Sequence, residues 1–217
     1  MGMMRTAAVL STALGLLLAA PGPCPAQQGK VIQQQLDSNG EGYTVLKVWG
    51  TDYQMGYAQG HLLAKPIVQG VQEVKKTLGL LYGLARTHMQ SAVWVPAGID
   101  QELDGMVAGI KARLPGAQVD KLDLKVSNTY GDWAYTMACR SHSAWGTFVK
   151  APTRTLSTRR LDFSVPAALQ SVKHHVLVAR HPSGGAPRWV NLAWPGYVTT
   201  ITGVNEYGTL NSVVTVP

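Results

Sequence analysis

The sequence predicts an α+β fold, because helical and strand patterns occupy separate parts of the chain. Between residues 53 and 135, apolar residues recur mostly every three or four positions, as on the buried face of a helix. From residue 143 onward they form short runs separated by Gly, Pro and Asn, as in strands joined by turns. No internal repeat or low-complexity linker interrupts either part.

The first 26 residues are expected to lie outside the fold. Arg5 supplies a positive start, residues 7–20 form an uncharged run rich in Ala and Leu, and Pro21-Gly22-Pro23 ends that run. The run is too short for a membrane-spanning helix and is followed by small residues, as in a secretory signal peptide cleaved near Ala26. We therefore expect a secreted or otherwise extracytoplasmic protein, with no integral membrane span after processing.

Residues 31–50 are predicted to form a strand pair ahead of the helices. Apolar and aromatic residues lie on either side of a Ser38-Asn39-Gly40 turn. Thr51 or Asp52 then supplies a side chain that can cap a helix beginning near Tyr53.

The first helix is expected to end at Pro66 and to pack tightly. Gly56, Gly60 and Ala64 lie four residues apart and share one face, which lets another backbone approach closely. The apolar pattern predicts further helices at residues 67–84, at residues 100–114 and within residues 119–135.

Short strands are predicted in the rest of the chain. Turns at residues 181–185 and 203–208 separate some of them, and residues 213–217 still have a strand pattern, so we expect the domain to continue past residue 217. The predicted strands span residues 143–149, 155–163, 172–179, 188–193, 197–202 and 209–216.

The chain carries a formal net charge of +7, with 19 Lys and Arg against 12 Asp and Glu, yet only 14% of its residues are charged. There is no basic run of the nucleic-acid-binding type, and the aromatic residues are dispersed, so we expect no nucleic-acid partner. A solvated basic face explains the excess; attraction of an anionic substrate is the functional alternative.

Cys139 is the one cysteine expected in the mature chain, because Cys24 lies in the signal segment. A lone thiol in an oxidising compartment is either buried and inert or used chemically. Cys139 stands where the helical pattern gives way to strands. A hairpin beyond it would bring Arg159 and Asp162 back to its side, where the cation can lower the pKa of the thiol.

Several stretches around these residues resemble one group of enzymes, the N-terminal-nucleophile (Ntn) cysteine hydrolases. This group includes choloylglycine hydrolases, acid ceramidases and acyl-CoA:penicillin-nucleus acyltransferases, and the last are the most similar. The matching stretches run in the same order over residues 50–211. They are Gly50-Thr51-Asp52-Tyr53-Gln54-Met55-Gly56-Tyr57-Ala58-Gln59-Gly60, Cys139-Arg140-Ser141-His142-Ser143-Ala144-Trp145-Gly146, Arg159-Arg160-Leu161-Asp162-Phe163, Trp194-Pro195-Gly196-Tyr197 and Gly203-Val204-Asn205-Glu206.

The resemblance implies an Ntn-hydrolase αββα sandwich that needs no cofactor and no metal. Residues 27–138 would form the helical α-chain or propeptide region, and residues 139–217 the start of the catalytic β-chain. Self-cleavage between Ala138 and Cys139 would expose Cys139 as the nucleophile. The enzyme would then act on a linear amide bond of a small N-acyl substrate, by hydrolysis or by acyl transfer through an acyl-enzyme.

Further residue roles are implied by the resemblance alone. Arg159 and Asp162 match an Arg-x-x-Asp pair that holds the thiol and the amine of the nucleophile in place. Asn205 matches a turn residue, and Thr215 lies nearest by spacing to an Asn that lines the oxyanion site, so both are tentative oxyanion or substrate residues. The group usually has Gly and Asn at two positions that here hold Thr158 and Arg160.

Two other readings stay open. A Cys–His hydrolase would pair Cys139 with His142, His174 or His175. The sequence that flanks Cys139 does not match the motifs of papain-like or caspase-like enzymes. His174 and His175 fall on opposite faces of a strand, which argues against joint metal ligation, and no other Cys/His cluster completes a zinc site. The second reading is a non-catalytic exported ligand-binding protein on the same fold, with Cys139 inert.

Overall fold

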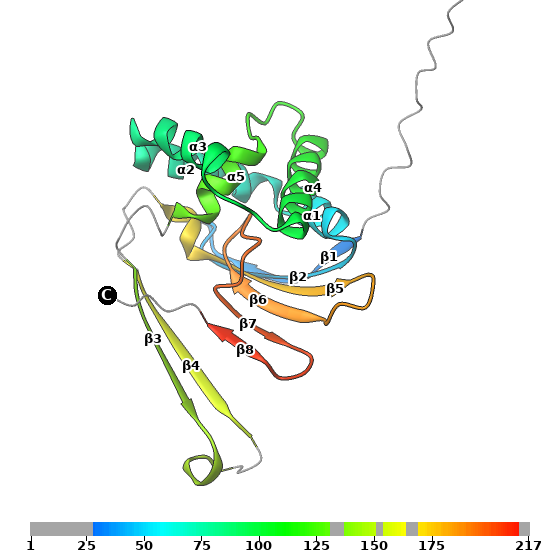
Figure 1. The fold of residues 1–217 in the computed structure, drawn as a ribbon, viewed down its shortest axis with the longest axis vertical. Helices are drawn as coiled ribbons and strands as arrows, with labels where there is room; N and C mark the ends of the chain where they lie inside the picture. Colours follow the sequence, from blue (N-terminus) through cyan, green and yellow to red (C-terminus); the bar gives the residue numbers. More distant parts are fainter. Residues whose placement is uncertain (1–27, 131–136, 151–153, 164–168, 213–217) are drawn as a thin grey trace, which may run out of the picture.

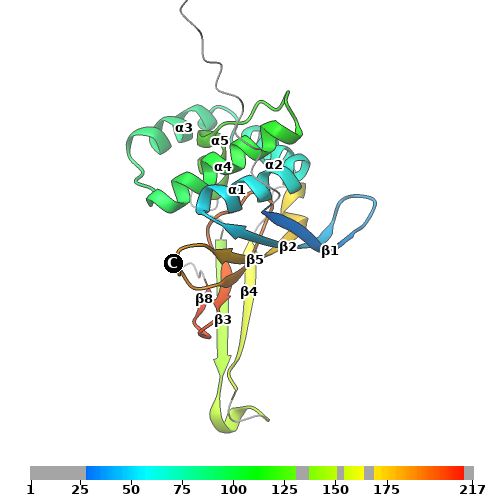
Figure 2. The same ribbon diagram turned by 90° about the vertical axis from the view of Figure 1, so that its right-hand side faces the viewer.

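Helices and strands form separate layers in the computed structural model of the chain, which describes residues 28–130, 137–150, 154–163 and 169–212. The described helices lie on one face of a six-stranded sheet, and a two-stranded hairpin extends away from its other side (Figure 1, Figure 2). This mixed architecture is compatible with the predicted α+β class. The helices are α1 (Asp52–Leu62), α2 (Ala64–Leu78), α3 (Leu81–Ser91), α4 (Ala97–Arg113) and α5 (Lys121–Asn128); the strands are β1 (Gly29–Leu36), β2 (Gly42–Gly50), β3 (Met137–Ala144), β4 (Leu156–Phe163), β5 (His174–Pro182), β6 (Trp189–Ala193), β7 (Thr202–Asn205) and β8 (Leu210–Ser212); short 3-10 helices are η1 (Gly146–Phe148) and η2 (Gln170–Lys173).

The large sheet has the strand order β1-β2-β5-β6-β7-β8. β1 and β2 form the predicted antiparallel pair, joined by a turn in which the Asp37 carboxylate accepts hydrogen bonds from the backbone N–H groups of Asn39 and Glu41. β2 then pairs in parallel with β5 along its whole length. Parallel neighbours need a long crossover connection, and here the helices and the hairpin β3–β4 together provide it.

Two of the described helices, α1 and α5, begin with a capping box. In α1, the Thr51 hydroxyl accepts from the N–H of Gln54, and the Gln54 side chain accepts from the N–H of Thr51. No helix in the described ranges is long and apolar enough to cross a membrane.

Two predicted helix boundaries and the predicted position of β3 are wrong. Pro66 does not end the first helix, because α1 already stops at Leu62 and Pro66 lies in the first turn of α2, where its missing N–H is not needed. The helix predicted at residues 67–84 is two helices, since Gly79 adopts a φ of +52° and ends α2. The strand predicted at residues 143–149 is displaced to β3, because the ladder with β4 ends at Ala144.

The predicted close packing of α1 is present, and its partner is α4. Two glycines on each helix lie so close to the other helix that an added side-chain carbon would overlap a backbone carbonyl. The pairs are Gly56 with Glu102, Gly60 with Met106, Gly105 with Tyr53, and Gly109 with Tyr57. The two backbones therefore touch along two helical turns, and neither helix can accept a side chain there without moving.

Gly60→Ala is expected to lower the free energy of unfolding by about 2 kcal/mol, because overpacking outweighs the roughly 1 kcal/mol that alanine gains over glycine in a helix. Gly83→Ala is the matched control, since Gly83 lies in α3 with open space around an added carbon. That change should raise stability by about 0.5–1 kcal/mol. Urea titrations of both variants check the prediction, and a stabilised Gly60→Ala protein would contradict it.

A network of buried polar side chains around Arg180 connects the large sheet to helices α1 and α4. The Arg180 side chain on β5 is fully buried and forms an ion pair with Glu102 of α4. Its Nε donates to Asn191 of β6 at 2.9 Å, and its Nη2 donates to Gln59 of α1 at 3.2 Å. Burial raises the pKa of Glu102, and the Arg180 guanidinium opposes that shift. Side chains of α1, α4 and β6 therefore meet at one guanidinium of β5, and those of α1 and α4 come from 121 and 78 positions away.

The apolar core has two parts. The larger one lies between the sheet and helices α1, α2, α4 and α5, and the smaller one lies between α2, α3 and α5. The buried members of the smaller cluster are Val74, Ala85, Met89, Val126, Tyr130 and Leu169.

Candidate active site

The predicted hairpin after Cys139 is present as β3 and β4. Cys139 lies opposite Leu161, Ala138 opposite Asp162, and Ser141 opposite Arg159. The peptide bond between Ala138 and Cys139 therefore faces the backbone of Leu161 and Asp162 across the ladder. Of residues 137–139 and 161–163 the structure describes the backbone and not the side chains. On the backbone, both members of the Arg-x-x-Asp pair therefore return to within two positions of Leu161, the residue opposite Cys139.

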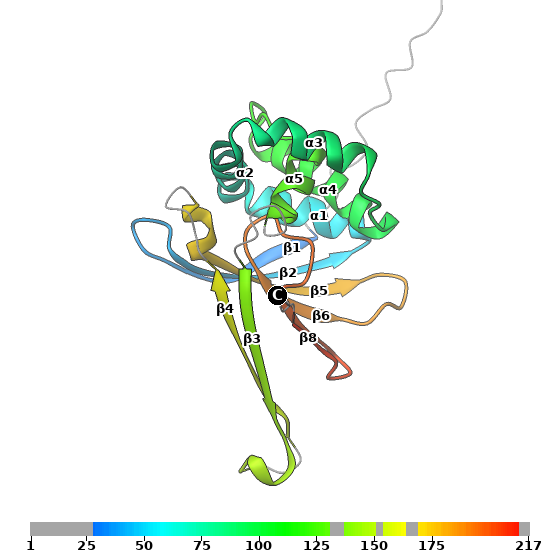
Figure 3. The ribbon, with the colours of Figure 1, turned by 60° about the vertical axis from the view of Figure 1, so that its left-hand side comes forward.

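Arg159 connects the hairpin to the large sheet. Its half-buried side chain lines a pocket together with residues of β5, β6 and the segment before β7. The other residues of this Arg159 pocket are His175, Leu192, Ala193, Trp194, Ile201 and Thr202. The end of the hairpin that contains Cys139 is therefore the end close to the sheet, while its other end projects away from it (Figure 3).

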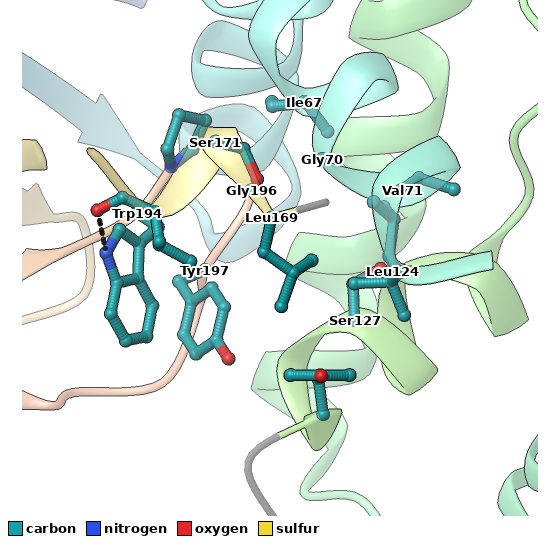
Figure 4. A pocket seen from close by; sticks show the side chains of 14 residues that line it. Ile67, Gly70, Val71, Leu124, Ser127, Leu169, Ser171, Trp194, Gly196 and Tyr197 are labelled. Carbon is teal, nitrogen blue, oxygen red and sulfur yellow. Dashed lines mark hydrogen bonds between the residues drawn. The ribbon is translucent and has the colours of Figure 1, made fainter. Parts of the chain in front are cut away.

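A second, apolar pocket lies between α2, α5, η2 and the loop that follows β6 (Figure 4). It has about 550 Å³ of empty space, part of it open to solvent. Aliphatic side chains from α2 and α5 form one wall, and Trp194 with Tyr197 forms another. Its lining residues are Ile67, Gly70, Val71, Val74, Leu124, Ser127, Tyr130, Leu169, Ser171, Val172, Trp194, Pro195, Gly196 and Tyr197.

Chain connectivity and one shared residue join the apolar pocket to the hairpin. Tyr130 on the pocket wall precedes Met137 by seven positions, and Leu169 follows Phe163 by six. Both strands of the hairpin are therefore tethered to the pocket at the end that contains Cys139. Trp194 lines both this pocket and the Arg159 pocket, so the two hollows are neighbours.

The loop at residues 194–198 is held by side chains rather than by a strand ladder. The Asn128 amide donates to the carbonyl of Gly196 at 2.9 Å and accepts from the N–H of Val198 at 3.0 Å. The Trp194 indole N–H donates to the carbonyl of Val172 at 2.8 Å, and its ring meets that of Tyr197 edge to face at 5.1 Å. Asn128 satisfies backbone groups that a neighbouring strand would otherwise bond. This explains why the strand predicted at residues 197–202 is wrong, with β7 beginning only at Thr202.

Sequence reasoning did not find Asn128 as a pocket-building residue. It is an ordinary polar residue at the end of a helix, and its role depends on a loop about 70 positions away. The only sequence signal for the loop was Trp194-Pro195-Gly196-Tyr197.

Of the two tentative oxyanion residues, only Asn205 lies within the described part of the chain, and it lines neither of the two pockets above. Asn205 is the last residue of β7, and its side-chain oxygen accepts from the N–H groups of Tyr207 and Thr209 in and after the turn that follows. It lines a different hollow, with Trp189 and neighbours. Its observed role is to hold this turn. Thr215 and the second half of the strand predicted at residues 209–216 lie outside the described residues.

The three candidate histidines occupy different surroundings. His142 lies opposite Thr158, three positions along β3 from Cys139, which is about 10 Å. His174 is buried and shares a 2.8 Å hydrogen bond with the Thr44 hydroxyl; burial lowers its pKa, with a smaller contribution from His175. His175 lines the Arg159 pocket.

Within the described ranges, no three His, Cys, Asp or Glu side chains lie close enough together to hold a metal ion. No protein-family model matches the sequence, and no curated protein sequence matches it either.

Proposed function

We propose that this protein is a self-cleaving Ntn cysteine amidohydrolase or acyltransferase that is exported and acts on a linear amide bond of an N-acyl substrate. The observation that carries the proposal is the register of β3 and β4. It sets the Ala138–Cys139 bond opposite Asp162 and leaves Arg159 two positions from Leu161, the partner of Cys139. A cation and a carboxylate beside one cysteine suit an activated thiol.

In the first step, the Cys139 thiol attacks the carbonyl carbon of Ala138. The C–N bond breaks, a thioester forms between the Ala138 carbonyl carbon and the Cys139 sulfur, and the Cys139 nitrogen takes up the thiol proton. Water then hydrolyses this thioester, which leaves a carboxylate on Ala138 and a free thiol and α-amine on Cys139. An α-amine has an ordinary pKa of about 7.7–8.0, so it can accept the thiol proton near neutral pH.

In turnover, the same thiol attacks the substrate amide, and the amine product leaves with the proton held by the α-amine. Water or an amine acceptor then takes the acyl group and regenerates the thiol. The Arg159 guanidinium favours the thiolate, and the Asp162 carboxylate, opposite Ala138, orients the new ammonium group. Because Trp194 is common to both hollows, the apolar pocket is within reach to hold the acyl group.

The proposal extends to the fold. A sandwich of the αββα type needs a sheet with helices on one face and a second sheet on the other. The outer face of the large sheet presents half-exposed apolar side chains: Leu192, Val204 and Leu210 are 42–44% exposed. The hairpin β3–β4, which reaches this face at the Arg159 pocket, would be the first part of that second sheet.

Intact-mass measurement of the exported protein tests the proposal. We expect two fragments, one from about Gln27 to Ala138 and one beginning at Cys139, and hydrolysis of N-acyl amides that improves with an apolar acyl group. A single chain that hydrolyses these amides would favour the Cys–His reading with His175. A single inactive chain that binds them saturably would favour the exported binding protein.

A further inference from the structure

Three leucines at the corner between α2 and α3 face solvent. Leu80, Leu81 and Leu84 are 99%, 60% and 67% exposed, and we call them the leucine corner. The opposite face of α3 packs onto the smaller core cluster through Ala85 and Met89. α3 lies on the outer side of the helical layer, away from the sheet (Figure 1, Figure 3). The corner is therefore a convex apolar surface on a helix that is already anchored on its other side.

The charge around this corner is one-sided. The 26 residues from Val74 to Ile99 contain no Asp or Glu and carry three cations, Lys75, Lys76 and Arg86. Lys76 is exposed, and no ion pair is formed by it within the described part of the chain. Trp94, which is 82% exposed, follows the other end of α3. Exposed leucines flanked by cations, with an aromatic side chain at the edge, are typical of surfaces that lie in a membrane interface.

A polar hollow lies between α2, α3, α4 and α5. It is lined by Tyr82, the neighbour of Leu81, and has about 750 Å³ of empty space, much of it solvent. Three cations and two carboxylates line it: Lys75, Arg86, Lys111, Asp120 and Asp123.

The carboxylates of this hollow are already neutralised. Asp123 binds Lys75 at 3.0 Å and also Arg86, and Asp120 binds Arg86 at 2.8 Å. Hydrogen bonding to Arg86 lowers the pKa of Asp120 to about 2, so this carboxylate stays ionised and paired at neutral pH. Lys111 has no carboxylate partner in the described structure. The hollow therefore keeps one uncompensated positive charge, that of Lys111.

We infer that the leucine corner docks on an anionic phospholipid surface, with Leu80, Leu81 and Leu84 entering the interface and Lys76 and Lys111 meeting the headgroup phosphates. The match between unpaired cations and anionic lipid favours this partner over a second copy of the chain, which is itself basic with a net charge of +7. Three side chains on a convex corner also offer too little area for a stable protein interface of about 800 Å² per partner.

The test is co-sedimentation of the exported chain with vesicles of equal parts phosphatidylcholine and phosphatidylglycerol, and with phosphatidylcholine alone. We expect tighter binding to the anionic vesicles, weakened by salt. The variant Leu80→Gln/Leu81→Gln/Leu84→Gln should lose about tenfold or more in affinity. Lys76→Gln/Lys111→Gln should lose affinity for the anionic vesicles only. Wild type and variants share the same N-terminal segment, so a difference between them belongs to the substituted residues.

Tyr207→Gln is the matched control, because Tyr207 is 76% exposed but lies in the turn between β7 and β8. It should bind vesicles like the wild type, and circular dichroism should show that every variant is folded. The inference is overturned if the wild type does not bind anionic vesicles or if the triple-leucine variant binds them equally well. A concentration-dependent dimer that the leucine changes abolish, without vesicle binding, would assign the corner to a second copy instead. Neither cleavage nor amidase activity enters this readout.

Discussion

Replacing Cys139 with alanine is expected to leave one uncut chain without amidase activity, while the wild type separates at the Ala138–Cys139 bond. The reason is that the proposed cleavage and the proposed turnover use the same sulfur as nucleophile. Cys139→Ser should still cut, but slowly, because a hydroxyl is a poorer nucleophile than a thiol at neutral pH. Intact mass reports cleavage, and release of amine from an N-acyl substrate reports turnover. Cleavage of the alanine variant at the same bond would rule out the mechanism.

The register adds a second arm to this experiment. Asp162→Asn removes the carboxylate opposite Ala138 and should reduce maturation or turnover by about 100-fold, the usual order for one positioned acid–base or orienting group. Arg154→Gln is the control for charge loss, since Arg154 is exposed and lies near the opposite end of the hairpin from Cys139. It should keep wild-type cleavage. Both variants should have the same urea midpoint of unfolding as the wild type. An Asp162→Asn protein with full activity would refute the assignment.

Arg180→Leu is expected to lower the free energy of unfolding by about 3–5 kcal/mol, because it leaves the Glu102 carboxylate buried without a counter-ion. Gln59 and Asn191 lose a donor at the same time. The double change Arg180→Leu/Glu102→Leu should be more stable than Arg180→Leu alone, since it removes the stranded charge. Urea titration at pH 7 measures both. Arg188→Met breaks the exposed pair with Glu206 and serves as control, with an unfolding midpoint near that of the wild type.

The pH dependence of this loss of stability distinguishes the effect of the unpaired Glu102 charge from that of lost packing. Burial raises the pKa of Glu102, and without Arg180 nothing opposes that shift. A carboxyl whose folded pKa exceeds its unfolded value favours the folded state at low pH and loses this contribution as pH rises through the folded pKa. The deficit of Arg180→Leu relative to wild type should therefore be smaller at about pH 4 than at pH 7. An equal deficit at both values would mean that lost packing is the cause.

Local features of this fold were predictable because their causes lie within a few residues. The Thr51 cap needs only Gln54, the turn after β1 needs only Asp37, and the small-residue face of α1 is visible in the spacing of Gly56 and Gly60. The hairpin that returns Arg159 toward Cys139 is also a local event, since adjacent strands joined by a turn pair readily.

Other features depend on contacts between distant parts of the chain, which local patterns do not encode. The sequence shows that α1 needs a close partner, but only the tertiary structure selects α4, through Gly105 and Gly109. It also selects the parallel neighbour of β2, which lies about 130 positions away in β5. Likewise, a buried arginine is not expected from composition, and Arg180 is tolerable inside only where its partners converge on it.

By itself, the sequence indicated a mixed fold of helices followed by strands, the approximate place of most of these elements, and the hairpin that returns Arg159 and Asp162 toward Cys139 on the backbone. The tertiary structure alone decided where the apolar pocket lies, that Asn128 builds its wall, and that the leucine corner stays uncovered. The physical reason is the range of the forces involved. Capping, turns and hairpin pairing act within a short stretch of chain, whereas burial and hydrogen-bond satisfaction depend on which distant surfaces the whole chain brings together.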